Sequence, residues 1–248
     1  MHITAIIPAR LNSTRLEEKL LISVEGKTIL QHVFERVDNS ALFDQVIIAT
    51  DSKKILKLAS KFGAHVIMTD KSHRSGTDRI AEVIRGIKTD IIVNVQGDEP
   101  LIEKEHLRTI ISLITKPKVE IATLCSDFES VKAVKSPSNV KVVSDINKKA
   151  LYFSRSVIPF PRADVLSDTY KHHIGLYAFK RKTLLRISRL KQSELEIMEG
   201  LEQLRWLHNG FEIYVGNVKN RTVSIDTAQD LKEFKGILKS RSVKRKGK

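Results

Sequence analysis

The stretch from residue 91 to residue 100 constrains the fold of this chain most. It begins with the apolar run Ile-Ile-Val-Asn-Val and changes abruptly to Gln-Gly-Asp-Glu-Pro. The apolar run suits a strand buried on both faces of a parallel sheet, and proline cannot continue such pairing. Gly97 permits a backbone conformation that larger residues resist. Because ligands bind beyond the carboxyl ends of strands in open α/β sheets, we expect Asp98 and Glu99 to reach a crevice. A carboxylate there can hold Mg²⁺ against a phosphate group. The alternative interpretation of these residues is a polar turn whose acid caps a helix.

Segments before this stretch alternate between strand and helix patterns. The strand patterns are short and β-branched, and the helix patterns carry apolar residues on one face. The expected strands are residues 3–7, 45–50 and 65–68, and the expected helices are residues 28–37, 51–63 and 77–86. This alternation predicts an α/β fold with a doubly wound parallel sheet and right-handed crossovers.

The pattern changes after Pro100. Short strand-like runs now follow one another between polar turns, which predicts an antiparallel extension of the parallel sheet. The expected strands are residues 119–124, 139–143, 150–154, 170–177 and 222–227, and the expected helices are 103–114, 196–208 and one from residue 228. The adjacent His172 and His173 would point to opposite faces of a strand, with at least one of them exposed, so a shared metal is not expected.

Cations gather in the loop that follows the first strand. Arg10, Arg15 and Lys19 flank the hydroxyl residues Ser13 and Thr14. Arginine binds phosphate with two parallel hydrogen bonds, and lysine adds a mobile charge. The loop can therefore wrap a polyphosphate, the alternative being ordinary surface charge. It is not a Walker-type loop, because the glycine-lysine pattern is absent.

A second loop joins the third expected strand to a helix. Ser75 and Gly76 would expose backbone N–H groups at the helix start, and Arg79 follows in the first turn. An anion site at the same crevice fits this pattern, and a plain helix cap is the alternative.

Composition limits the class of protein. The chain has 248 residues, 41% of them hydrophobic, and a formal net charge of +14. No apolar run is long enough to span a membrane, and the amino terminus does not read as a signal peptide, which predicts a cytoplasmic protein. Residues 239–248 hold six basic residues and no acid, which predicts a disordered tail that is dispensable for the main activity. A nucleic-acid-binding role through that tail is an alternative, although no known binding motif supports it.

Together these segments resemble the 3-deoxy-manno-octulosonate (Kdo) cytidylyltransferases. The resemblance runs in the order of that family from residue 3 to about residue 238. It is carried by residues 7–10, 13–15, 19, 49–51, 68–69, 75–79, 93–100, 140–143, 150–155, 158–159, 173–177, 201–205 and 223–227.

The resemblance implies a Rossmann-like nucleotidyltransferase fold, similar to nucleotide-diphospho-sugar transferases, with a mixed sheet. Residues 1–238 would form one domain, with an antiparallel dimerisation and sugar-binding region near residues 119–180, and the chain would be a homodimer. The implied reaction transfers CMP from CTP to the anomeric hydroxyl of Kdo, for lipopolysaccharide synthesis. Mg²⁺ would be the cofactor, and neither nucleic acid nor membrane would be required.

The resemblance also implies roles for particular residues. Arg10, Lys19 and Asp98 would be catalytic, and Asp98 and Asp226 would hold the metal. The implied nucleotide-binding residues are Pro8, Ala9, Arg10, Ser13, Thr14, Arg15, Lys19, Ser75, Gly76, Gln96 and Asp98. The implied sugar-binding residues are Arg79, Gln96, Arg155, His173, Tyr177, Glu202 and Gln203, with Arg155 pairing the sugar carboxylate. From its position alone, Asp226 reads as a helix cap.

One departure from the family pattern stands next to Lys19. The family reads Leu-Pro-Gly-Lys where this chain reads Leu16-Glu17-Glu18-Lys19. Two carboxylates beside a triphosphate are unfavourable unless they point outward. Two alternatives to the implied function are the same reaction on the 8-amino analogue of Kdo or another sugar acid, and an inactive paralogue. A sialate synthetase is disfavoured, because residues 75–79 and 201–205 differ from the pattern of that family.

Overall fold

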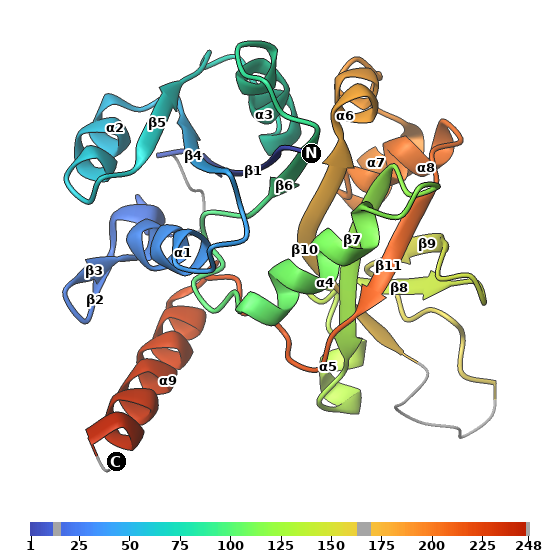
Figure 1. Cartoon of the computed structure of the whole chain (residues 1–248). Helices are drawn as coiled ribbons and strands as arrows, with labels where there is room; N and C mark the ends of the chain where they lie inside the picture. Colours follow the sequence, from blue (N-terminus) through green and yellow to red (C-terminus); the bar gives the residue numbers. More distant parts are fainter. Residues whose placement is uncertain (12–15, 163–169, 247–248) are drawn as a thin grey trace. The chain divides into compact units, whose positions relative to one another are not determined.

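The computed structural model of the chain describes residues 1–11, 16–162 and 170–246, with side chains up to residue 240. The chain forms two compact units, each assembled from separate stretches (Figure 1). The amino-terminal unit comprises His2–Thr89, Asn94–Leu107 and Thr222–Lys248. The central unit comprises Met1, Asp90–Val93 and Arg108–Arg221.

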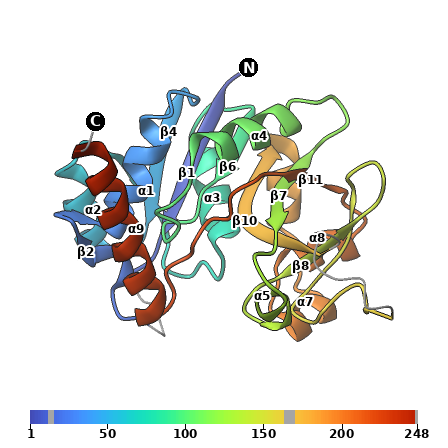
Figure 2. The ribbon, with the colours of Figure 1, turned by 90° about the horizontal axis from the view of Figure 1, so that it is seen from below.

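Parallel strands in the order β1, β4, β5 form the sheet of the amino-terminal unit. Their bounds are Ile3–Ala9 for β1, Gln45–Thr50 for β4 and His65–Met68 for β5. Ile6 lies opposite Ile47 in the register, and both side chains are fully buried. Helices α1 (Ile29–Asp38) and α3 (Gly76–Arg85) lie on opposite sides of β1 (Figures 1 and 2). The predicted doubly wound arrangement is therefore present in this unit.

Local signals begin the helices where the sequence places them. The side-chain oxygens of Thr28, Ser52 and Ser75 accept hydrogen bonds from the backbone N–H three residues further on. These caps start α1, α2 (Lys53–Ser60) and α3. The remaining elements of the unit are the 3₁₀ helix η1 (Lys19–Leu21), the hairpin β2 (Ser23–Val24) and β3 (Lys27–Thr28), and α9 (Ala228–Lys246).

The central unit has a mixed sheet. Its neighbouring strands run in the order β11, β7, β10, β6, and β8 and β9 extend from β10. The bounds are β6 Ile91–Asn94, β7 Ile121–Asp127, β8 Lys141–Ser144, β9 Ala150–Ser154, β10 Lys171–Lys180 and β11 Ile213–Asn217. Asn94, the last residue of β6, belongs to the amino-terminal unit. The helices are α5 Val131–Lys135, α6 Arg181–Ile187, α7 Glu194–Glu199 and α8 Gln203–His208, while α4 (Lys104–Ile114) joins the two units in sequence.

Two predicted elements are wrong. The single helix over 196–208 is instead α7 and α8, because Gly200 adopts a left-handed conformation (φ 62°) that ends α7. The strand over 222–227 does not form: that segment pairs with no strand among the described residues, although the N–H of Ile225 donates to the carbonyl of Asp98 at 2.9 Å.

Other boundaries also differ from expectation. The unit that holds the predicted 119–180 region extends over residues 108–221, because β11 pairs with β7 and α6 packs on β10. Residues 239–246 continue α9 instead of forming a disordered tail. Lysine and arginine are good helix formers, so their charge alone does not end the helix.

Glu18 carries backbone strain. It adopts φ 45° and ψ 34°, the left-handed region, where the related family has glycine. Its carboxylate forms an ion pair with Lys54 on α2 at 2.5 Å, and both side chains are exposed. The Glu18 carboxylate therefore meets the condition of pointing outward that its position beside Lys19 imposes.

We expect Glu18→Gly to stabilise the protein. Relieving the left-handed conformation should raise the free energy of unfolding by about 1 kcal/mol, against a small loss from the exposed ion pair. Urea denaturation measures the change. Glu17→Gly is the control, because Glu17 has no positive φ and should gain nothing. A Glu18→Gly protein less stable than the wild type would contradict the strain argument.

Candidate active site

Lys19 lies between two aspartates in the amino-terminal unit. Its Nζ is 2.5 Å from Oδ2 of Asp98 and 2.8 Å from Oδ1 of Asp226. The Lys19 side chain is only 14% exposed, against 21% and 35% for the aspartates. Burial by itself would lower the pKa of Lys19, but the two carboxylates hold it above its ordinary value. The ammonium is therefore charged, and it neutralises one of two clustered negative charges.

The backbone around this cluster is fixed by packing. Lys19 begins the 3₁₀ turn η1, and the neighbouring Leu20 is buried. A Cβ placed on Gly97 would come within 3.5 Å of the Leu20 side chain and 3.2 Å of the Pro8 carbonyl oxygen. Gly97 is thus required by close approach, not by the special backbone conformation expected from sequence, since its φ is not positive.

Asp226 does not cap α9. Thr227 does, because its Oγ1 accepts from the N–H of Asp230, while the Asp230 carboxylate accepts from the N–H groups of Asp226 and Thr227. The Asp226 side chain is thereby left to meet Lys19. The capping role read from position alone is wrong, and the role implied by the resemblance fits this placement.

Glu99 does not emerge into a crevice as predicted. It is 5% exposed, and its Oε2 has no hydrogen-bond partner among the described residues. Burial, reinforced by the charge of Asp98, raises its pKa to about 8. A carboxyl group in this environment stays protonated at neutral pH, which avoids a third negative charge beside the aspartates.

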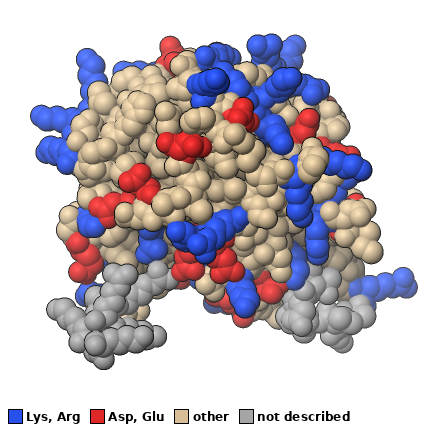
Figure 3. Space-filling model, in the orientation of Figure 1, with Lys and Arg blue, Asp and Glu red and all other residues tan. Residues whose placement is uncertain are grey.

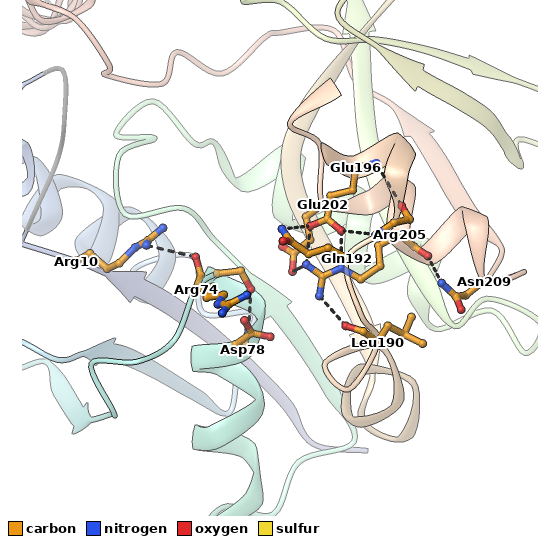
Figure 4. A network of polar contacts seen from close by, with 11 residues as sticks. Arg10, Arg74, Asp78, Leu190, Gln192, Glu196, Glu202, Arg205 and Asn209 are labelled. Carbon is orange, nitrogen blue, oxygen red and sulfur yellow. Dashed lines mark hydrogen bonds and ion pairs between the residues drawn. The ribbon is translucent and has the colours of Figure 1, made fainter. Parts of the chain in front are cut away.

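Arg10 lines a cavity beyond the carboxyl ends of β1, β4 and β5. The cavity has a volume of about 590 Å³ and is lined by Arg10, Leu11, Asp51, Ser52, Lys53, Met68, Lys71 and His73. The Arg10 guanidinium donates to the Arg74 carbonyl at 3.4 Å (Figure 4). Cations outnumber carboxylates in this lining, and such a cavity suits an anion.

The other predicted nucleotide residues lie near β1. Ser75 caps α3, and the ring of Pro8 would be 3.2 Å from a Cβ on Gly76. Ala9 is buried at the end of β1, and the Gln96 amide donates to the Asn94 side chain at 3.2 Å. Ser13, Thr14 and Arg15 lie outside the described residues.

The Arg79 side chain is buried and binds other residues of the protein. It is 1% exposed, and its guanidinium pairs with Asp51 at 2.6 Å and donates to Thr69. A buried charge needs such a partner, so the pair joins α3 to the ends of β4 and β5. This placement gives Arg79 a scaffolding contact, and its contact with the sugar stays a prediction.

His173 and Tyr177 meet in the central unit. Nε2 of His173 lies 2.9 Å from the Tyr177 hydroxyl and 3.1 Å from Oγ1 of Thr123. A register shift in β10 between Ile174 and Tyr177 accompanies this pairing. Burial, with a smaller effect of His172, lowers the pKa of His173 to about 3, so the ring is neutral. Neither His172 nor His173 is exposed, contrary to expectation.

A buried ion pair supports the helix that carries Glu202 and Gln203. Arg205 binds Glu196 through two hydrogen bonds of 2.7 and 2.6 Å, and its guanidinium lies 3.9 Å from Glu202 (Figure 4). The amide nitrogen of Gln203 and the indole nitrogen of Trp206 are buried without partners among the residues described. Trp206 was not predicted as a site residue, and its only signal in the sequence is that it is the sole tryptophan.

Arg155 binds backbone carbonyls. Its guanidinium donates to the carbonyl oxygens of Glu199 at 2.7 Å, Pro137 at 3.0 Å and Gly200 at 3.5 Å. The buried Lys141 in turn donates to the Arg155 carbonyl at 2.6 Å. Arg155 therefore links β9 to the end of α7, and a sugar carboxylate would have to share it with these contacts.

The fold and these clusters define a nucleotidyltransferase. Residues 4–215 match the cytidylyltransferase family. The solved structure of CMP:2-keto-3-deoxy-manno-octonic acid synthetase complexed with CTP is 38% identical, with a TM-score of 0.92, over 97% of this chain and 100% of that one.

Curated relatives narrow the class. A 3-deoxy-manno-octulosonate cytidylyltransferase of Koribacter versatilis is 42% identical over 238 residues, covering 96% of this chain and 90% of its own length. One from Francisella tularensis subsp. holarctica is 44% identical over 95% of this chain and 98% of its own length. The chain belongs to the 3-deoxy-manno-octulosonate cytidylyltransferase family, which confirms the resemblance. Within the described ranges, no helix is long and apolar enough to cross a membrane.

The neutral state of His173 predicts a pH effect on stability. Its folded pKa of about 3 lies below the unfolded value near 6.5. As pH falls through this window the unfolded chain gains a proton that the folded one does not, so the free energy of unfolding falls, by up to about 1.4 kcal/mol per pH unit. His173→Gln should reduce this decline in urea denaturation between pH 7 and pH 4.

His208→Gln is the matched control, since His208 is exposed in the same unit. It should decline like the wild type. Parallel declines for the wild type and His173→Gln would show that His173 titrates normally in the folded protein.

Proposed function

We propose that the chain transfers CMP from CTP to the anomeric hydroxyl of Kdo, releasing pyrophosphate and activating Kdo for lipopolysaccharide synthesis. The sugar oxygen forms a bond to the α-phosphorus, and the bond from that phosphorus to the β-phosphate oxygen breaks. The observation that carries the proposal is the Lys19–Asp98–Asp226 cluster, in a chain 38% identical to a synthetase solved with CTP. Since CTP is a cytoplasmic nucleotide, the proposed reaction takes place in the cytoplasm.

We propose Asp98 and Asp226 as the ligands of Mg²⁺. Both carboxylates already converge on one cation, and carboxylate oxygens are the donors that Mg²⁺ prefers. Among the residues described, no group of three or more histidine, cysteine or acidic side chains is placed to hold a metal. Phosphate and water oxygens would complete the coordination, as is usual for Mg²⁺ at nucleotides. The ion would neutralise charge on the phosphates.

The remaining groups orient the substrates. Arg10 and Lys19 offer cations for the triphosphate, and no side-chain nucleophile is needed, so catalysis depends on positioning and electrostatics. In the central unit, neutral His173 with Tyr177 and Glu202 offers hydrogen-bonding groups to a polyhydroxy acid. These groups do not by themselves distinguish Kdo from its 8-amino analogue.

A nucleic-acid-binding role has less support. On the face drawn in Figure 3, lysine and arginine side chains are spread out with acidic side chains among them. A nucleic-acid site usually gathers its cations along one face or stripe. The net charge of +14 fits anionic small-molecule substrates equally well.

Pyrophosphate release tests the proposed function directly. With CTP, Mg²⁺ and Kdo, the wild type should release pyrophosphate, and Asp98→Asn should lower kcat by about 100-fold or more. Asp38→Asn, the same change at the exposed end of α1, is the matched control and should retain activity. Faster pyrophosphate release with the 8-amino analogue than with Kdo would identify that analogue as the substrate. No release with either sugar, or an active Asp98→Asn enzyme, would refute the proposal.

A homodimer is a further part of the proposal. Large apolar side chains stand exposed in the central unit, including Leu151 (60%), Phe160 (84%) and Met198 (85%). Leu151 lies on β9, which pairs with β8 alone among the described strands and is also contacted by α8. Exposed apolar side chains are typical of protein interfaces.

We expect sedimentation to show a dimer for the wild type and a monomer for Leu151→Asp. Asp127→Asn, a change of an exposed polar residue in the same unit, should leave the dimer intact. A Leu151→Asp protein that sediments like the wild type would exclude β9 from the interface.

A further inference from the structure

Lys19 occupies the place where the proposed metal would bind. Its ammonium contacts one oxygen of Asp98 at 2.5 Å and one of Asp226 at 2.8 Å. An ammonium is a compact point charge, and here it meets two carboxylates that would otherwise repel each other. The protein thus supplies its own counter-ion to this pair.

A divalent ion and this ammonium compete for the same oxygens. The pair of aspartates carries two negative charges, of which Lys19 already balances one. A second cation within a few ångströms of the ammonium would be repelled, because the effective dielectric constant near a protein surface is well below that of water. Metal binding to both carboxylates therefore requires the ammonium to move away.

The Lys19 side chain can move while its backbone stays in place. The turn η1 is closed by the N–H of Ile22 donating to the Lys19 carbonyl at 3.2 Å, and buried Leu20 packs against Gly97. Among the described residues, the ammonium binds the two aspartates alone, and it stands at the end of a flexible four-carbon stem. Rotation of that stem can carry the charge to a nearby anion without moving the loop.

We propose that Lys19 is a metal-gated phosphate ligand. In the nucleotide-free enzyme it neutralises Asp98 and Asp226. A divalent ion arriving with the nucleotide replaces it there, and the freed ammonium pairs with phosphate. Each charge keeps a partner throughout, so metal and nucleotide bind cooperatively and metal alone binds weakly. The identity of the anion rests on the proposed function, but the competition between Lys19 and the metal does not.

Metal binding without nucleotide tests the exchange. Mn²⁺ is the probe, and its free concentration is measured by electron paramagnetic resonance. Lys19→Met should bind Mn²⁺ about tenfold more tightly than the wild type, because the internal competitor is gone. Lys54→Met is the matched control: it removes the same charge from the neighbouring ion pair with Glu18 and should leave Mn²⁺ affinity unchanged. Equal or weaker Mn²⁺ binding by Lys19→Met would overturn the proposal.

Further variants separate competition from a structural effect. Lys19→Arg keeps the charge and should keep the weak Mn²⁺ binding of the wild type, whereas Lys19→Gln should bind like Lys19→Met. Adding Asp98→Asn to Lys19→Met should abolish the gain. Tight Mn²⁺ binding by Lys19→Arg would assign the effect to loop structure and refute the exchange.

The nucleotide completes the test. CTP should tighten Mn²⁺ binding by the wild type more than by Lys19→Met, since linkage requires the two ligands to help each other through the displaced ammonium. An enzyme inactive towards both sugars that still shows the Lys19→Met gain would refute the proposed function and leave the exchange standing. An active enzyme whose Lys19→Met variant binds Mn²⁺ no more tightly would support the proposed function and refute the exchange.

Discussion

The cluster of Lys19, Asp98 and Asp226 is the interaction on which the amino-terminal unit depends. It joins residues separated by 79 and 207 positions along the chain. The N–H of Ile225 donates to the Asp98 carbonyl beside it, so backbone and side chains hold the same junction. Removing Lys19 would leave two partly buried carboxylates without a counter-charge, which costs more than the ion pairs themselves contribute. The stability of the unit and the proposed metal binding thus depend on the same charges.

Local signals in the sequence predicted the parts of the fold that local physics decides. β5 and β9 have the predicted bounds, because β-branched runs between polar turns require little else. The break at Gly200 was also readable: Ser193 and Glu196 form a capping box that starts a helix, and a glycine ends it within two turns. The segment 222–227 was misread because its alternation resembles a strand, whereas the N–H of Ile225 donates to the Asp98 carbonyl and those of Asp226 and Thr227 donate to the Asp230 carboxylate.

The candidate site was predictable in its residue types but not in its contacts. Asp98 followed from the end of a buried strand, whereas Asp226 needed the resemblance, since its position alone favoured a helix cap. Arg155 shows the limit most clearly. Its guanidinium donates to carbonyls of Glu199, Pro137 and Gly200, which only folding brings together. Every residue has a backbone carbonyl, so residue types do not show which carbonyls accept a hydrogen bond. An arginine that supports a site therefore cannot be distinguished by sequence from one that binds a ligand.

Glu17 and Glu18 change the backbone strain of the loop more than they change the electrostatics around Lys19. Glu18 points to Lys54 on α2, and Glu17 is exposed, so neither carboxylate is paired with the ammonium of Lys19. The left-handed backbone at Glu18 keeps the turn that glycine would allow, and Lys19 still reaches both aspartates. Because the turn survives at the expense of strain, the contacts of Lys19, the proposed phosphate ligand, are retained.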